Sequence, residues 1–219
     1  MSKLTNFFST TPGTKFSLVV LAIALISMKL LPASWGQENS PIEWSQVVIL
    51  ACAVIAAVLA AYFGVCSLHQ RKLLLWSVPV WLLAIGRELS WGRVFYVNSD
   101  GSFVNLANLW YGTYVHPLIA CVILITVWGL LKNGLSVEIL EWYKYGTVPL
   151  IEILILVGAG MFATGVEHFS FGIFGLNEEL YEELAETVCY STLLFLLIDL
   201  GFCRRIQPSR AHNIKSYTL

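Results

Sequence analysis

The sequence predicts an all-α integral membrane protein, a single bundle of six transmembrane helices over residues 1–219. The first observation is composition: 57% of the residues are hydrophobic and only 12% are charged, whereas soluble domains carry about 25% charged residues. The second is the recurrence of apolar runs close to the roughly 20 residues that cross a hydrocarbon core. The third is a one-sided distribution of charge between the segments that join those runs.

The apolar runs define the predicted spans, which cover about 16–35, 44–68, 73–96, 106–131, 147–166 and 180–202. The first run has one feature of a signal peptide, since Lys3 and Lys15 precede it. However, Trp35 stands where a small residue should precede a cleavage site. We therefore expect the first helix to be retained.

The connecting segments fall into two alternating groups. One group holds ten of the thirteen Lys and Arg residues, namely Lys3, Lys15, Arg71, Lys72, Lys132, Lys144, Arg204, Arg205, Arg210 and Lys215. The other holds ten of the fourteen acids, namely Glu38, Glu43, Glu88, Asp100, Glu167, Glu178, Glu179, Glu182, Glu183 and Glu186. Because Lys and Arg collect in cytoplasmic loops, this partition predicts a bacterial inner-membrane protein with both termini in the cytoplasm.

Two polar segments are expected on the cytoplasmic side. The stretch VEILEWYKY, residues 137–145, is typical of a short amphipathic helix that lies on the membrane interface. The polar residues 206–219, which include Pro208, indicate a mobile cytoplasmic tail. Neither segment divides the chain into further domains.

Small residues indicate where helices pack closely. In the second span the small residues four apart are Ala53, Ala57 and Ala61, and likewise Ala56, Ala60 and Gly64, and the fifth span carries Gly158, Gly160, Ala163, Thr164 and Gly165. Such spacing allows the backbones of neighbouring helices to approach each other. We therefore expect packing seams in both spans.

The stretch RELSWGR, residues 87–93, places charges directly after an apolar run. The uncharged run 73–86 rises only about 21 Å as a helix, whereas the hydrocarbon core is about 30 Å thick. We therefore expect the helix to continue through this stretch to about Tyr96. Arg87 and Glu88 then lie inside the membrane and must face the bundle or a water-filled cavity.

The sixth span has a similar feature at its periplasmic end. Its uncharged run, residues 187–198, is too short to cross the membrane, so Glu186 and its acidic neighbours must enter the outer leaflet. Glu179, Glu182, Glu183 and Glu186 share one helical face. A row of like charges requires a basic partner, a metal ion or protons.

These residues and three others are predicted to lie in one layer in the outer half of the bundle. His116 is expected about ten residues into the fourth span, and Glu167 and His168 end the fifth. The complete set is Arg87, Glu88, His116, Glu167, His168, Glu183 and Glu186. Two interpretations stay open, a set of salt bridges that orient the helices and a single functional pocket.

Three other charged residues lie near the ends of spans. Lys29 is expected to extend its ammonium group from the first span toward the interface. Glu152 and Asp199 lie toward the cytoplasmic ends of the fifth and sixth spans. We expect these two acids to be solvated, with a paired or proton-conducting role as the alternative.

The first functional hypothesis is an enzyme that acts on an envelope lipid or another small ligand from the periplasmic side. Its catalytic residues would be Glu88, Glu183 and Glu186 as general bases and His116 as a proton donor. Its ligand-binding residues would be Arg87, Arg93, Glu167 and His168, with the arginines holding a phosphate. The sequence contains no diagnostic catalytic motif, so whether the protein is an enzyme stays open.

The second hypothesis is a cation- or proton-coupled transporter or a metal-binding membrane protein. The pair Glu167–His168 and the acids of residues 182–186 could bind a divalent metal or carry protons. The Glu-x-x-His spacing of two-metal carboxylate centres is absent from the sequence. No particular metal or cofactor is therefore predicted.

The third hypothesis is a structural or regulatory subunit whose acidic periplasmic face binds another envelope protein. The net charge of −1 gives no indication of a nucleic-acid partner. Membrane lipids are expected partners in every case, because the predicted spans are apolar.

Overall fold

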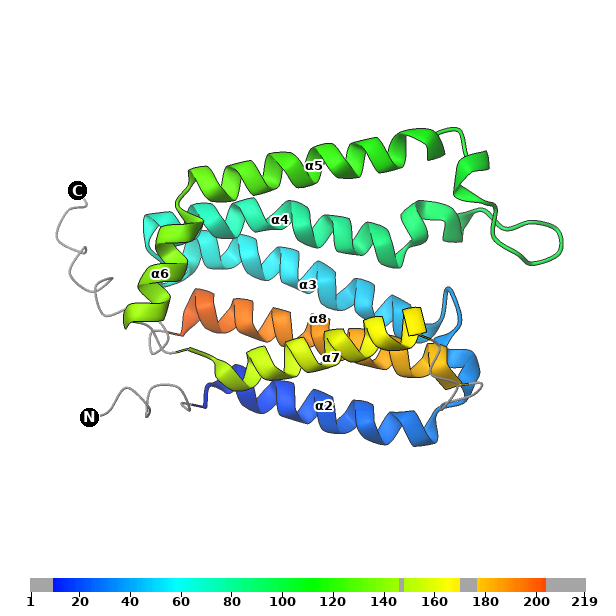
Figure 1. The fold of residues 1–219 in the computed structure, drawn as a ribbon, viewed down its shortest axis with the longest axis horizontal. Coiled ribbons are helices and arrows are strands. Elements are labelled where there is room, and N and C mark those ends of the chain that lie inside the picture. Colours follow the sequence, from blue (N-terminus) through cyan, green and yellow to red (C-terminus); the bar gives the residue numbers. More distant parts are fainter. Residues whose placement is uncertain (1–9, 146–147, 170–176, 204–219) are drawn as a thin grey trace.

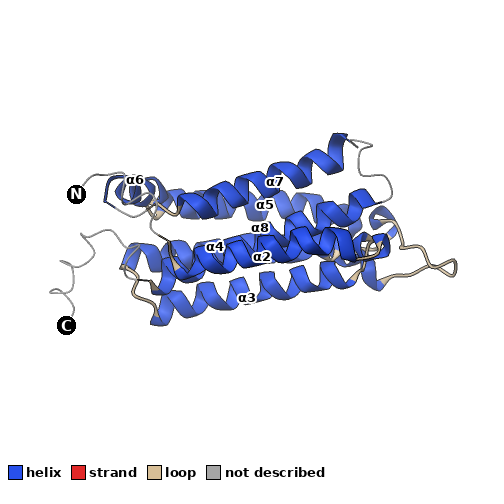
Figure 2. Ribbon diagram, turned by 90° about the horizontal axis from the view of Figure 1, so that it is seen from below, coloured by secondary structure: helices blue, strands red, loops and turns tan. Residues whose placement is uncertain are grey.

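A computed structural model describes residues 10–145, 148–169 and 177–203. These residues form helices and no strands, with one isolated β-bridge between Val97 and Phe103. Six long helices run side by side in one bundle (Figures 1 and 2). They are α2 (Pro12–Leu30), α3 (Pro41–Phe63), α4 (Leu68–Glu88), α5 (Gly112–Lys132), α7 (Leu150–Phe169) and α8 (Glu178–Phe202). The predicted all-α class is confirmed.

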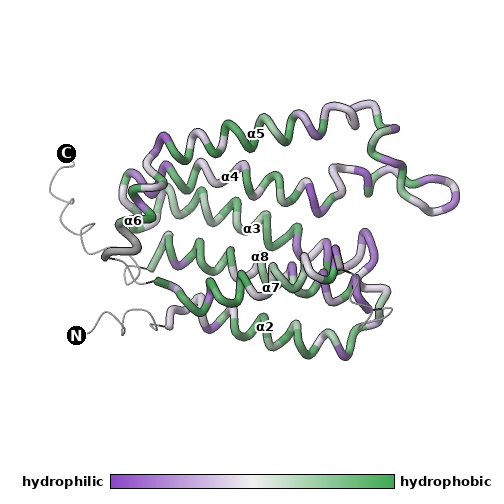
Figure 3. The backbone as a smooth tube through the Cα atoms, in the orientation of Figure 1, coloured by the Kyte–Doolittle hydropathy of each residue, from purple (hydrophilic) through white to green (hydrophobic). Residues whose placement is uncertain are grey.

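Membrane-crossing character is clear for five of these helices, which are long and apolar enough to span a bilayer. The sixth, α4, is as long but carries Arg71 and Lys72 near its beginning and Arg87 and Glu88 at its end. Figure 3 shows the same pattern: hydrophobic residues follow the helices, and hydrophilic residues lie mainly at the helix ends and in the connecting segments. The bundle is therefore consistent with the six predicted spans.

The bundle has two chemically different ends. We call the end where α2 begins and α8 ends the basic end, since Lys15, Arg71, Lys72 and Lys132 lie near it. The short helix α6 (Leu135–Tyr145) lies across this end (Figure 1), as expected for the amphipathic stretch. We call the opposite end, where α4 ends and α8 begins, the acidic end. The predicted tail, residues 206–219, lies outside the described residues.

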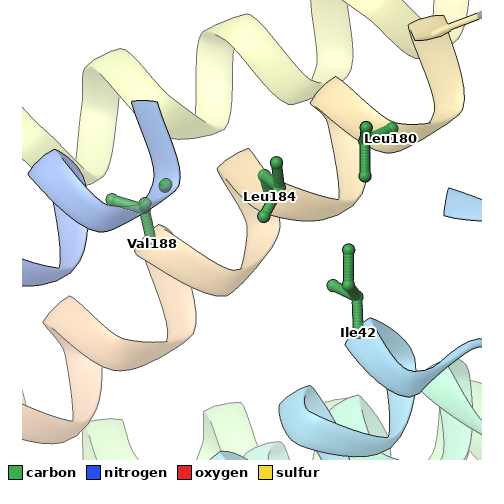
Figure 4. Close-up of a cluster of buried hydrophobic side chains, with 5 residues drawn as sticks. Ile42, Leu180, Leu184 and Val188 are labelled. Atoms are coloured by element: carbon green, nitrogen blue, oxygen red, sulfur yellow. The ribbon is translucent and has the colours of Figure 1, made fainter. Parts of the chain in front are cut away.

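Helix α8 is the centre of the bundle. Half of its apolar window is buried, a larger share than in the other spans, and it packs against α2, α3 and α7. Its buried Leu180, Leu184 and Val188 form a hydrophobic cluster with Ala24 of α2 and Ile42 of α3 (Figure 4). Residues on the inward face of α8 are thereby held in place from three sides.

Close packing of α3 follows the predicted small-residue pattern. Ala53, Ala57 and Ala61 are buried, and Ala60 meets Gly201 of α8 so closely that a Cβ atom would not fit there. On α7 the predicted Ala163 and Gly165 are buried, but the prediction is wrong for Gly158, which is exposed and has no neighbour within 4 Å of a built Cβ position. Small residues permit close approach, but the neighbouring helices decide which face is used.

The third predicted span is wrong in its last part. Helix α4 ends at Glu88 instead of continuing to Tyr96, and residues Ser90–Phe95 form the 3-10 segment η2. Ser90 and Trp91 have positive φ angles of 45° and 57°. The Trp91 ring folds back over Gly86, whose missing side chain makes room for it. The chain therefore turns directly after the charged pair.

Other predicted boundaries differ as well, including that of the second span, predicted to end at 68, which ends at Phe63 of α3. The first span, predicted over 16–35, is α2, which ends at Leu30 because extended Leu31 precedes Pro32. The 3-10 turn η1 (Ala33–Gly36) follows. The fourth span, predicted over 106–131, begins only at Gly112, since residues 106–108 form the separate 3-10 turn η3 (Leu106–Asn108).

Candidate functional site

Three helices bring side chains together at the acidic end. Helix α4 supplies Arg87 and Glu88 in its last turn. Helix α8 supplies Glu183 and Glu186, which are three residues apart and therefore share a face. Helix α3 supplies Gln46 from its second turn. We call these five residues the carboxylate site.

Glu88 is the most enclosed carboxylate of this site. Its side chain is only 3% exposed. Its Oε1 accepts a hydrogen bond of 2.7 Å from the hydroxyl of Tyr190 and lies 3.6 Å from Nη1 of Arg87. Because a buried carboxylate without partners is costly, these two contacts explain how Glu88 is tolerated inside the bundle.

Arg87 connects the two long helices that carry the carboxylates. Its Nη2 donates to Oε1 of Glu186 at 2.6 Å, and its Nη1 donates to the Tyr190 hydroxyl at 3.0 Å. Half of the Arg87 side chain remains exposed, whereas that of Glu186 is 12% exposed. Arg87 is therefore the more exposed partner of this ion pair.

Gln46 meets Glu183 from the side of α3. Its Nε2 donates to Oε2 of Glu183 at 2.8 Å and to the Glu183 carbonyl at 2.9 Å. Gln46 is completely buried, and its Oε1 has no hydrogen-bond partner. A buried amide oxygen without a donor is unusual and calls for a ligand, a water molecule or a proton-bearing group beside it.

The three carboxylates form a set that could hold a metal ion. One ligand atom from each of Glu88, Glu183 and Glu186 lies within 4.8 Å of the others. Each carboxylate uses one oxygen in the hydrogen bonds described above and retains a second. Arg87 offsets one of the three negative charges, so the ionised site keeps a surplus that a cation or protons would neutralise.

Arg93 lies outside this set. Its guanidinium forms an ion pair with Glu38, which also accepts a hydrogen bond of 2.8 Å from the Ser90 hydroxyl. This pair fastens η2 to the segment between α2 and α3. The structure therefore gives Arg93 a partner of its own.

The predicted layer is only partly assembled. The structure brings Arg87, Glu88, Glu183 and Glu186 together. His116 is exposed in the second turn of α5, because that helix begins later than predicted. Glu167 and His168 are exposed at the end of α7 and lie 3.5 Å from each other. Among the described residues no hydrogen bond or ion pair joins these three to the carboxylate site, so their place in a common layer stays a prediction.

Gln46 and Tyr190 were missed by the sequence analysis. Tyr190 follows Glu186 by four residues on α8, a spacing that places both on one face. From that spacing, the sequence could have predicted that Tyr190 lies beside Glu186. Gln46 lies near the end of an apolar run and has the pattern of an interface residue, so only the packing of α3 against α8 reveals its role.

A second buried polar cluster lies at the basic end. Glu152 of α7 is 1% exposed and accepts hydrogen bonds from the hydroxyls of Thr11 and Thr14. Asp199 of α8 is 5% exposed and accepts from the Gly13 backbone at 2.9 Å. The expectation that both acids are solvated is wrong. They satisfy amide and hydroxyl groups at the beginning of α2, where negative charge is favoured.

Comparison with known proteins gives no relative: no protein family, no curated protein and no solved structure matches this chain. The chemistry of the two clusters and of the cavities therefore carries the functional assignment.

Proposed function

We propose that this chain is a multi-pass inner-membrane protein that binds a divalent cation at its acidic end. The acidic end faces the periplasm in this proposal, and both termini lie in the cytoplasm. The orientation is supported by the ten of thirteen Lys and Arg residues in the segments assigned to the basic end.

The observation that carries the proposal is the convergence of Glu88, Glu183 and Glu186, of which one ligand atom each lies within 4.8 Å of the others. An acidic surface alone would not suggest a ligand. Here the carboxylates come from two different helices, and Nε2 of Gln46 on a third helix holds Glu183 in place.

The donor set suits a hard cation. Carboxylate and amide oxygens are the ligands that Ca²⁺, Mg²⁺ and Mn²⁺ prefer, and water completes their coordination. No thiol or imidazole takes part in this group of the described residues. Arg87 is half exposed, so it can pair with Glu186 without the cation and move outward when the cation binds.

The lipid-directed alternative uses some of the same residues. It requires Arg87 and Arg93 to hold a phosphate, but these guanidiniums are already paired with Glu186 and Glu38. A phosphate would therefore have to displace a carboxylate from each arginine. The cation proposal uses the carboxylate oxygens that take no part in these ion pairs. No contact among the described residues favours the third hypothesis, a structural or regulatory subunit.

Titration of the purified protein with Mn²⁺, followed by electron paramagnetic resonance, tests the proposal. We expect one bound ion per chain. The variants Glu88→Gln and Glu183→Gln should weaken binding at least as much as the roughly 10- to 100-fold that follows loss of a residue supporting a metal ligand.

The matched control is Glu179→Gln, which removes the same charge from an exposed position on α8. It should leave the affinity for Mn²⁺ nearly unchanged. If all three variants bind Mn²⁺ as the unmodified chain does, or if that chain binds none, the proposal is wrong. Equal weakening by all three would instead indicate diffuse charge attraction and would also contradict a defined site.

A further inference from the structure

A large cavity lies at the other end of the molecule from the carboxylate site. It has a volume of about 610 Å³ and is lined mainly by apolar side chains of α4, α5, α6, α7 and α8. On α4 it extends from Gln70 to Trp81, and on α8 from Leu193 to Leu200. The cavity therefore occupies the half of the bundle that adjoins the basic end.

The packing of the helices explains why this space exists. Helix α5 packs mainly on α4, whereas α7 packs on α8, and α3 connects the two pairs through α4 and α8. The outer helices α5 and α7 are therefore separated on the side away from α3. Leu135 and Ile139 of α6 line the cavity where that helix crosses the end of the bundle.

The side chains that line the cavity favour an alkyl chain as the ligand. A volume of 610 Å³ lies within the range of about 300–1,000 Å³ of ligand pockets. Water needs about three polar partners to be held in a buried space. The few polar side chains here already bond with one another: Gln70 donates to Glu138, and Trp81 donates to Ser77 at 3.3 Å. A flexible apolar chain fills such a space best.

A basic side chain lies beside one of the residues that line the cavity. Cys66 lines the cavity, and its carbonyl accepts a hydrogen bond of 3.4 Å from Nε of Arg71. Arg71 and its neighbour Lys72 are exposed in the first turns of α4. Basic side chains and the positive end of a helix both attract phosphate.

We propose that this cavity binds an anionic phospholipid from the leaflet at the basic end, with an acyl chain inside and the phosphate at Arg71. The proposal does not depend on the carboxylate site, because no residue is shared between the two. It assigns a specific lipid to a defined position, in contrast to the general coating of lipid that every membrane protein carries.

Photo-crosslinking in vesicles tests the proposal. The protein is reconstituted with a phosphatidylglycerol whose acyl chain carries a photoactivatable group, and cross-linked peptides are identified by mass spectrometry. We expect cross-links concentrated on the cavity walls of α4 and α8. Cross-links spread evenly over outward-facing residues such as Val80 and Ile198 would overturn the proposal.

Two cavity-filling variants act on opposite walls. Leu196→Trp and Leu74→Trp occupy space that the acyl chain would use. Each should lower cross-linking of the protein by the photoactivatable lipid about tenfold, as expected when about two methylene groups of the acyl chain are no longer buried in the cavity. Their matched controls are Ile198→Trp and Leu75→Trp, which lie outside the cavity lining on the same helices. Equal cross-linking of the cavity-filling and control variants would contradict the proposal. Because the two filling substitutions lie on different helices, the test remains valid if one variant does not fold.

The phosphate part is tested with Arg71→Gln. This substitution should lower the preference for phosphatidylglycerol over phosphatidylcholine about fivefold, since one basic residue near an anionic surface contributes about that factor. Lys15→Gln removes an exposed charge from the same end of the bundle and should leave the preference unchanged. Equal labelling by the two lipids in the unmodified chain would contradict this part.

Discussion

Arg87 of α4 and Glu186 of α8 form an ion pair with 2.6 Å between Nη2 and Oε1. The two residues are 99 positions apart in the sequence. Helices α4 and α8 are held mainly through α3, which packs on both. Together with the hydrogen bonds of Tyr190 to Glu88 and Arg87, the ion pair links α4 and α8 directly at the acidic end.

Loss of this link should destabilise the bundle. We expect Arg87→Gln to lower the free energy of unfolding by about 1.5 kcal/mol, the lower part of the range for a hydrogen bond to a charged group, because half of the arginine side chain is exposed. The measurement is equilibrium unfolding in mixed detergent micelles. Adding Glu186→Gln should give a double-mutant coupling above about 0.5 kcal/mol. Lys29→Gln, at an exposed position at the same end of the bundle, is the control. Strictly additive losses for Arg87→Gln and Glu186→Gln would show that the ion pair contributes nothing to stability.

The beginning of α2 should depend on the acids that contact it. Glu152→Gln removes the charge that accepts from two threonine hydroxyls, and we expect a loss of about 1–3 kcal/mol. Thr11→Ala removes the helix N-cap and should cost about 1 kcal/mol. Equilibrium unfolding in micelles measures both. Glu179→Gln, which is exposed, should have little effect, and an equally small effect of Glu152→Gln would refute the structural role of this acid.

Two glycines should respond oppositely to the same substitution. Gly201 of α8 faces Ala60 so closely that Gly201→Ala must push α3 and α8 apart, which we expect to cost about 1–3 kcal/mol. Gly158 of α7 has no neighbour within 4 Å of a built Cβ position, so Gly158→Ala should be neutral or should stabilise by up to about 1 kcal/mol. Thermal unfolding of both variants measures these changes in stability. Similar losses at the two positions would contradict the described packing of α3 on α8.

Cys66 provides a prediction on pH. It lies between α3 and α4, and burial raises the pKa of its thiol from 9.0 to about 11. In the folded chain the thiol therefore stays neutral between these two values, whereas in the unfolded chain it ionises. Its contribution to stability is fully present below pH 9.0 and is lost as the pH rises toward about 11.

Maleimide labelling measures this effect. In a chain whose other cysteines are replaced by alanine, folded Cys66 should react slowly at pH 8 and faster as the pH approaches 11. The same chain unfolded in detergent should already react rapidly near pH 9. Identical pH profiles for the folded and unfolded chains would show that Cys66 is not shielded.

The sequence by itself determined the membrane bundle. Length and apolarity of the runs decide which segments can cross a bilayer, and these are local properties of the chain. The same bilayer argument indicated that Arg87 and Glu88 could not be left facing lipid, and the structure places Glu88 among α8 residues. It failed at residues 89–96, because the turn depends on Trp91 folding over Gly86.

The tertiary structure alone decided which polar residues meet. Helical spacing predicts that Glu183 and Glu186 share a face, but it cannot tell that Gln46 and Tyr190 complete their surroundings while His116 points outward. It also could not place Glu152 and Asp199 against the beginning of α2. Periodicity fixes the direction of a side chain relative to its own helix. Contacts between helices depend on their rotation and depth, which follow from the fit of all their surfaces at once.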